Sequence, residues 1–189
     1  MQTWLGAQGY PPDWDAPVWD GDLAVHLGPA SAGWVWITLS AAARAQSAKL
    51  RCSNVYDPFE NVLAWLEALA RGEFPPVLVI DEEGIVKRLW VRPVVPGDAR
   101  IEFRVSGDLY QPDARDPQDH AFLLLRTTRR QLVRAWTERQ LAWLDDVYDP
   151  AEWSMDWCSE EATDELRQKM DMRNLFPARL RAVLRLVGG

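Results

Sequence analysis

The spacing of apolar residues changes near residue 127, and this change restricts the fold more than any other feature of the sequence. Before it, short apolar or alternating segments separated by Gly, Pro and Asp predict strands; after it, apolar residues recur every three or four positions, as in helices. Strands followed by helices favour an α+β fold over alternating α/β units. The predicted strands are 23–27, 34–39, 50–53, 77–81, 85–92, 100–106 and 121–126.

Two of these strands give expectations for particular side chains. The strand at 100–106 alternates cleanly, so its three apolar residues are expected to face the core and its charged residues to face solvent. The predicted outward set is Arg100, Glu102 and Arg104. Trp34 and Trp36 are expected in the core, because each large ring can bury a great deal of apolar surface.

One helix is predicted within the strand region, at 58–71. Asp57 fits the N-cap, Pro58 the first helical position, and Glu60 the third position of a capping box. Apolar residues then fall on one face, and Gly72 supplies a stop signal. We expect this helix to pack on one face of an antiparallel sheet. Residues 41–48 are expected to form only a short helical turn or linker.

The last third of the chain is predicted to be helical. The expected helices run from Thr127 or Thr128 to about Tyr148, from Ser159 to about Met172, and from Pro177 to the Gly188-Gly189 end. The apolar stripe of the first is Leu132, Val133, Trp136, Trp143, Leu144 and Val147. Its arginines lie near the positive end of the helix dipole and Asp145 and Asp146 near the negative end. Acidic groups elsewhere in the fold, or a binding partner, must offset this unfavourable arrangement.

A short pattern, Val-Tyr-Asp-Pro-x-Glu, occurs twice, at 55–60 and at 147–152. A duplicated domain would repeat over a longer span, and the flanking sequences show no such repetition. The Asp and Pro positions both suit helix initiation. We therefore interpret the second copy as the start of another capped helix.

The chain length fits one domain. We predict a single α+β domain with an irregular Trp-, Asp- and Pro-rich lead-in at 1–22, a sheet with one packed helix at 23–126, and a helical region at 127–189. The N-terminus lacks the basic and apolar regions of a signal peptide, and no apolar stretch approaches the length of a membrane span. These features predict a cytoplasmic protein.

Acidic side chains are concentrated at 145–165, which holds nine Asp or Glu residues and no Lys or Arg. The chain as a whole has a net charge of −7, so the remainder carries a small positive charge. Trp153 and Trp157 lie among these carboxylates and are expected to anchor a partner. This mixture predicts a surface that binds a basic protein. The predicted partner-binding residues are Asp145, Asp146, Asp149, Glu152, Trp153, Asp156, Trp157, Glu160, Glu161 and Asp164.

A different arrangement of the acidic block remains open at this point. Residues 167–189 carry six basic side chains and one acidic side chain. This tail, or the arginines of 126–139, would neutralise the block if it folded over it. Four further Asp residues at 13–22 have no basic neighbour in sequence, which favours a partly exposed acidic surface.

The sequence contains no recognisable motif for catalysis or cofactor binding. It lacks a Gly-rich phosphate loop, HExxH, GxSxG and a zinc-type Cys/His cluster. We therefore predict no catalytic residue, cofactor or metal site. Asp116, Asp119 and His120 form the one compact group that could hold a divalent metal, but an Asp-rich turn before a strand is much the commoner explanation for such a group.

Cys52 and Cys158 are far apart and outside any CxxC pattern, so they are interpreted as free thiols. His26 is interpreted as a half-buried strand residue. Dyads of Cys52 with His26, or of Cys158 with His120, would require only that the side chains meet in space.

In type, a small acidic α+β protein resembles the inhibitors that bacteria and phages produce. The acidic balance argues against direct binding to nucleic acid or to anionic membranes. The function that we expect is that of a bacterial immunity protein, which binds and occludes a cognate toxin. One alternative is a phage-encoded antagonist of a bacterial defence complex, acting as an acidic decoy for a nucleic-acid-binding groove. An enzyme with an unrecognised site is the second alternative. The sequence does not indicate an oligomeric state.

Overall fold

The computed structural model describes residues 19–41, 46–73, 77–109, 120–154, 159, 161 and 163–188. The strands are β1 (Trp19–Asp20), β2 (Leu23–Leu27), β3 (Trp34–Ala41), β4 (Gln46–Ser53), β5 (Val77–Asp81), β6 (Ile85–Pro93), β7 (Arg100–Leu109) and β8 (His120–Thr128). The helices are α1 (Phe59–Arg71), α2 (Arg129–Asp146), α3 (Pro150–Trp153), α4 (Asp164–Met170), α5 (Met172–Leu175) and α6 (Pro177–Gly188). The predicted α+β class is confirmed.

The strands form two sheets rather than one. One has the order β1-β8-β7-β6-β5, and the other has the order β2-β3-β4. All neighbouring strands are antiparallel except β1, which pairs with β8 in parallel. The two sheets approach each other where β4 nears β8, and there the Leu124 N–H donates to the Gln46 side chain at 3.5 Å.

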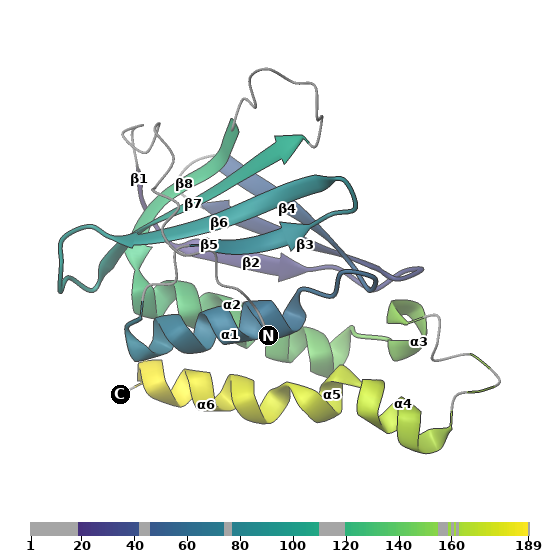
Figure 1. The fold of residues 1–189 in the computed structure, drawn as a ribbon. Helices are drawn as coiled ribbons and strands as arrows, with labels where there is room; N and C mark the ends of the chain where they lie inside the picture. The colour runs from purple at the N-terminus through teal and green to yellow at the C-terminus, as the bar shows by residue number, and fades with distance from the viewer. Residues whose placement is uncertain are drawn as a thin grey trace.

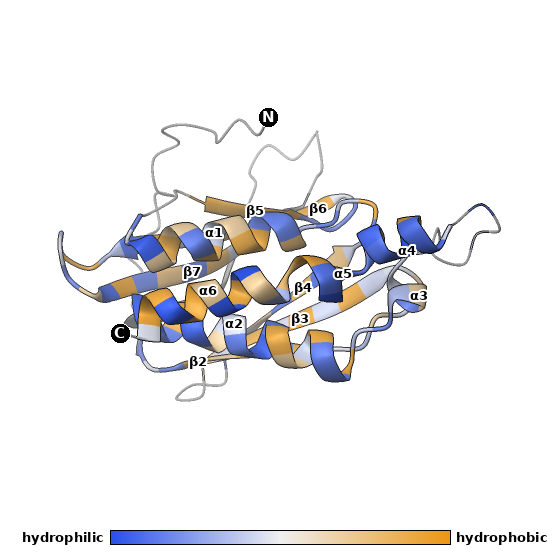
Figure 2. Ribbon diagram, turned by 90° about the horizontal axis from the view of Figure 1, so that it is seen from below, coloured by the Kyte–Doolittle hydropathy of each residue, from blue (hydrophilic) through white to orange (hydrophobic). Residues whose placement is uncertain are grey.

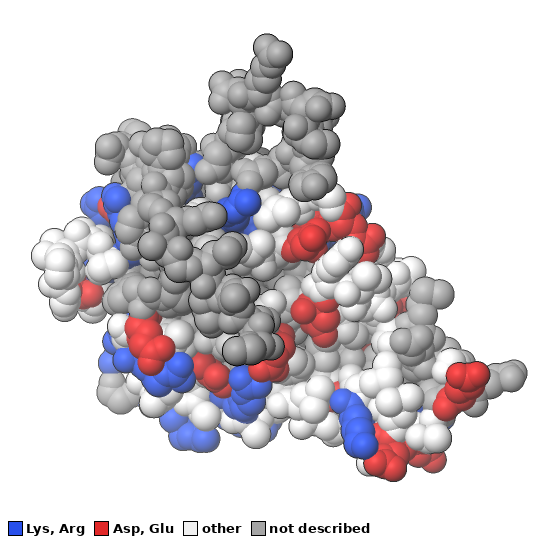
Figure 3. Space-filling view, in the orientation of Figure 1, with Lys and Arg blue, Asp and Glu red and all other residues white. Residues whose placement is uncertain are grey.

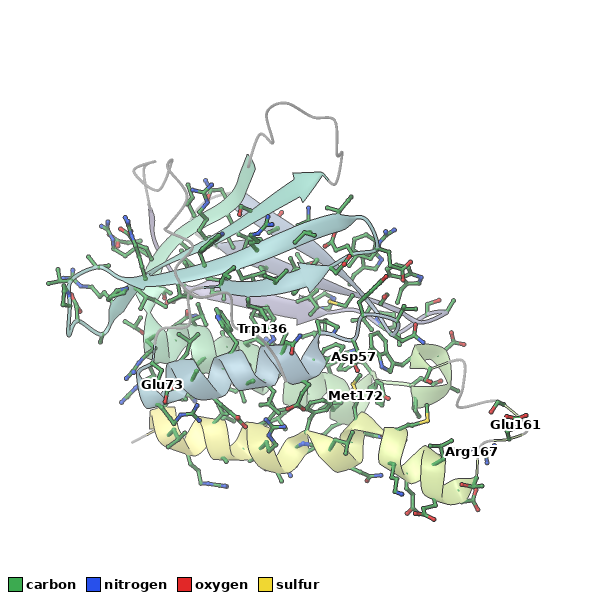
Figure 4. The ribbon with its side chains drawn as sticks, viewed as in Figure 1. Asp57, Glu73, Trp136, Glu161, Arg167 and Met172 are labelled. Atoms are coloured by element: carbon green, nitrogen blue, oxygen red, sulfur yellow. The ribbon has the colours of Figure 1, made fainter. Side chains whose placement is uncertain are left out.

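The helices stack beneath the sheets in two layers (Figure 1). α1 and α2 lie directly against the sheets, and α6 packs along both of them from the outside (Figure 2). The apolar faces of both sheets and of these three helices join in one continuous core. Trp136 lies near its centre, between the sheets and the helices (Figure 4).

The helix predicted at 58–71 is α1. The N-cap is Pro58 rather than the predicted Asp57, although the Asp57 carboxylate accepts the Phe59 N–H at 2.9 Å. Gly72 ends the helix in the left-handed region at φ 87°. The capping-box role expected of Glu60 is not observed, because its carboxylate accepts instead from Arg179 Nη1 at 2.7 Å. The Arg129 guanidinium occupies the space that a Cβ at Gly72 would need. This position places a cation at the negative end of the α1 dipole.

The expectation that Trp34 and Trp36 lie in the core is wrong. Val35, Ile37 and Leu39 of β3 are fully buried, so the two tryptophans fall on the opposite face of the strand. Trp36 is 49% exposed. Since side chains alternate strictly along a strand, the three branched apolar residues determine which face is inward.

The alternation predicted for β7 is confirmed, but the charged face is not open to solvent. Glu102 and Arg104 are buried, with exposures of 7% and 0%. Arg92 of β6 and Arg126 of β8 bracket the Glu102 carboxylate at 2.7 and 2.9 Å. β7 lies between these two strands, so each neighbour places an arginine beside Glu102, and the two ion pairs offset the cost of burying its carboxylate.

Several boundaries and exposures in the predicted elements also differ. β4 begins at Gln46, where a helical turn was expected. In the apolar stripe of α2, Val147 is 42% exposed because the helix has ended at Asp146. The helix expected from Ser159 is α4, and it begins at Asp164 because the Thr163 side chain provides the cap, accepting from the Leu166 N–H.

Candidate protein-binding surface

A cluster of aromatic rings lies where α1, α2 and α3 meet. Phe59 stacks on Trp143 with ring centroids 5.2 Å apart and meets the Trp153 ring edge-on at 5.4 Å. Trp143 also contacts Tyr148 at 5.0 Å. Trp153 is only 4% exposed. Trp153 therefore does not lie on the surface, as its predicted anchoring role requires, because its ring packs against Phe59 in the core.

The two copies of the repeated hexapeptide lie side by side on this cluster. Asp57 accepts the Phe59 N–H and Asp149 accepts the Ala151 N–H, each at 2.9 Å. The second copy therefore does start a capped helix, as predicted, although α3 is only four residues long. The contact between Phe59, in the first copy, and Trp153, directly after the second, brings the two turns together.

These turns expose apolar side chains that the sequence analysis did not select. Val55 is 69% exposed, Tyr56 52% and Val147 42%. The matching Tyr148 is buried, and burial raises its pKa to about 12. The repeated hexapeptide was the one sequence feature that marked these two turns. Because its residues are explained by helix initiation alone, it did not indicate that the two copies lie together. We call Val55–Asp57, Val147–Asp149, Asp145, Asp146 and Glu152 the twin-turn surface.

Four of the predicted acidic residues border the twin turns. Asp145 and Asp146 are exposed on the last turn of α2, and Asp149 is exposed at the start of α3. Glu152 fixes α3 to the loop between β2 and β3: its carboxylate accepts from the Ala32 N–H at 3.2 Å, and its carbonyl accepts from the Gly33 N–H at 2.7 Å.

The remaining acidic candidates lie further along the chain. Glu161 is exposed and projects beyond α3 and α4, away from the body of the molecule (Figure 4). Asp164 is exposed at the start of α4 and lies 3.3 Å from Arg167. Asp156, Trp157 and Glu160 are outside the described residues, so their predicted roles stay predictions.

The basic tail reaches only part of the twin-turn surface within the described structure. The Arg173 guanidinium lies 5.9 Å from the centroid of the Tyr148 ring, and Asp171 chiefly, with Asp149 adding a smaller effect, raises the pKa of Arg173. Arg173 pairs with Asp171 at 2.6 Å, and Arg179 pairs with Glu60 and Glu67 of α1 at 2.7 and 2.9 Å. Among the described residues, no Lys or Arg lies within ion-pair distance of Asp145 or Asp146. In the view of Figure 3, acidic side chains also lie at the end of the molecule where α4 is placed, with a basic side chain beside them.

The residues considered for catalysis do not assemble into a site in the described structure. His26 is exposed on the outer side of β2, whereas Cys52 of β4 is buried on the inner side of the same sheet, so they cannot form a dyad. The interpretation of His26 as half-buried is thus also corrected. Cys158, Asp116 and Asp119 lie outside the described residues. Within the described part of the chain, no three His, Cys, Asp or Glu side chains are placed to hold a metal ion.

One carboxylate of the acidic turn between β5 and β6, at 81–83, is buried. Glu82 is 5% exposed and accepts the Arg51 N–H at 2.8 Å. Burial raises the pKa of Glu82, and this hydrogen bond opposes the shift. The contact joins the β5–β6 turn to β4, so the role of Glu82 is to hold the two sheets together.

Comparisons of the chain with protein-family models, with curated proteins and with solved structures found no match. No helix in the described ranges combines the length and the apolar character needed to cross a membrane.

Proposed function

We propose that this protein binds a basic protein through the twin-turn surface and inhibits it, as a cytoplasmic immunity protein that occludes a cognate toxin. One observation carries the proposal. Asp145 and Asp146 are exposed, have no cationic partner among the described residues and occupy the unfavourable end of the α2 dipole. Because these two carboxylates lower the stability of α2, we expect them to contribute to binding a partner.

The composition of the twin-turn surface supports the same proposal. Exposed carboxylates attract a basic partner over distance, and the exposed side chains of Tyr56, Val55 and Val147 supply apolar area that can be desolvated on contact. Tyr56 thus takes the anchoring role that was predicted for Trp153. The buried aromatic cluster beneath holds both turns in place, so little ordering is needed on binding.

The test uses the products of neighbouring genes that stop the growth of host cells when they are expressed alone. Each is co-expressed with the protein, and survival of the host cells is scored. Asp145→Lys/Asp146→Lys should abolish protection while leaving the fold intact, because lysines at the end of α2 favour the helix dipole. Unchanged protection by this double variant would contradict the proposal.

A matched control separates local charge from total charge. Glu73→Lys/Glu83→Lys makes the same change in net charge at two exposed carboxylates outside the twin-turn surface, and Glu73 lies at the opposite end of α1 from Asp57 (Figure 4). This control should retain protection. Equal loss in both double variants would show that the effect depends on net charge and not on the twin-turn surface.

A further inference from the structure

The outer face of the β2-β3-β4 sheet carries basic side chains, whereas the twin-turn surface carries acidic ones. Trp36 stands 49% exposed near its middle. Beside it the Arg51 guanidinium lies over the Trp34 ring, 4.4 Å from its centroid. The register places Arg51 opposite Trp36, and Lys49 opposite Thr38. The outward residues of the three strands are Ala24, His26, Trp34, Trp36, Thr38, Ser40, Ser47, Lys49 and Arg51.

This outer sheet face carries cations and no carboxylate among its described residues, although the chain as a whole is acidic. Lys49 and His26 are both exposed. Arg51 is held in place by Trp34 and by the Glu82 carbonyl, which accepts from Arg51 Nη2 at 3.0 Å. The Glu82 carboxylate is turned away from the surface into its contact with the Arg51 N–H. A fixed guanidinium beside an exposed Trp is the combination that dominates protein-binding hot spots.

We propose that the outer sheet face is a second protein-binding surface, whose ligand is a short carboxylate-bearing segment of a partner protein. Carboxylates of the segment would pair with Lys49 and Arg51, while an apolar group packs on Trp36. This proposal goes beyond the function proposed for the twin-turn surface and does not depend on it.

Two physical arguments favour a peptide segment over other occupants. Nucleic acid held without sequence preference needs many phosphate contacts, and this face offers two permanent cations on a chain of net charge −7. The face is also small: three strands about 4.8 Å apart and up to eight residues long cover roughly 400 Å², about half of what one partner contributes to a standard interface. A second whole copy of the chain would therefore be held weakly.

The segment is expected to lie across the face and not to extend the sheet. The edge of β2 is capped by α2 at both ends: the Gln131 side chain bonds the Leu23 N–H and C=O at 3.2 and 3.0 Å, and Trp143 Nε1 donates to the Gly28 carbonyl at 2.7 Å. A partner strand would have to displace these bonds. A segment that contacts Trp36 and Lys49 on the face of the sheet does not have to displace any of these hydrogen bonds.

The experiment selects ligands from a random 12-residue peptide library displayed on phage, using the immobilised full chain and counter-selection against Trp36→Ser. Enriched peptides should be rich in Asp and Glu. A synthetic copy of one should bind the wild type in solution and bind Trp36→Ser and Lys49→Glu at least tenfold more weakly, as expected for hot-spot positions. Leu186→Ser, at an apolar residue of α6 that is 56% exposed, is the matched control and should bind normally.

Three results would overturn the proposal: no peptide that depends on Trp36, enrichment of basic peptides, or a twelve-nucleotide oligothymidine that binds this face more tightly than the selected peptide. The result is also independent of the twin-turn surface. Asp145→Lys/Asp146→Lys should bind the acidic peptide as the wild type does, so failure of one proposal can be distinguished from failure of the other.

Discussion

At the scale of single residues, burial of Tyr148 makes stability depend on alkaline pH. Its pKa is raised from an ordinary value near 10 to about 12, chiefly by burial. Between these values the unfolded chain releases the phenolic proton and the folded chain keeps it, which favours unfolding. The free energy of unfolding should therefore hold up to about pH 10 and fall as the pH rises toward 12.

The measurement is urea unfolding of the wild type and of Tyr148→Phe at several values between pH 8 and 11. The variant cannot ionise at this position, so it should lose less stability over this range. Parallel pH profiles for the two proteins would contradict the assignment.

Cys52 gives a second prediction at this scale. Burial raises the pKa of its thiol, and the nearby charges of Glu82 and Asp57 raise it further. Because the thiolate is the reactive form, Cys52 should resist iodoacetamide at pH 8 in the folded protein and react once urea unfolds the chain. Mass spectrometry of the peptide containing Cys52 distinguishes the two states, and rapid labelling of the native protein would be the contrary result.

At the scale of elements, the sequence predicted what local periodicity controls. Alternation located most strands, and the Asp57 and Gly72 signals located α1 almost to the residue. The prediction that Trp34 and Trp36 are buried was wrong because it relied on the size of their rings. The alternation of Val35, Ile37 and Leu39 along the same strand indicates instead that the tryptophans face outward. Burial of Glu102 could not be foreseen, since it depends on partners supplied by two other strands.

The assignments of the tryptophans can be tested by paired substitutions. Trp153→Ala should remove the ring that packs on Phe59 and lower the free energy of unfolding by about 3–5 kcal/mol. Trp36→Ala, at a half-exposed position, should cost about 1 kcal/mol or less. Urea unfolding of both variants provides the comparison. Equal losses, or a larger loss at Trp36, would mean that the sheet presents the opposite face to the core.

At the scale of the whole molecule, the candidate surface was only half predictable. The acidic residues were evident from composition, but their exposure depends on where the basic tail goes. Arg179 spans more than one hundred positions to reach Glu60 and Glu67, and no local pattern encodes that choice. The meeting of the two repeated turns is likewise a property of the packed helices, so Tyr56 was not identified from sequence.

The division of roles on the twin-turn surface predicts distinct kinetic effects of charge and of apolar contact. With the toxin identified by co-expression, Asp145→Lys/Asp146→Lys should slow association, most strongly at low salt, because exposed charges act over distance and are screened by ions. Tyr56→Ala should instead raise the dissociation rate with little change in association, since the ring contributes only once it is in contact. Surface-binding kinetics across a series of salt concentrations, with Glu73→Lys/Glu83→Lys as the charge control, separate the two effects. If neither the salt concentration nor Asp145→Lys/Asp146→Lys changed the association rate, the twin-turn surface would not be part of the interface. This would hold even if the toxin bound elsewhere on the molecule.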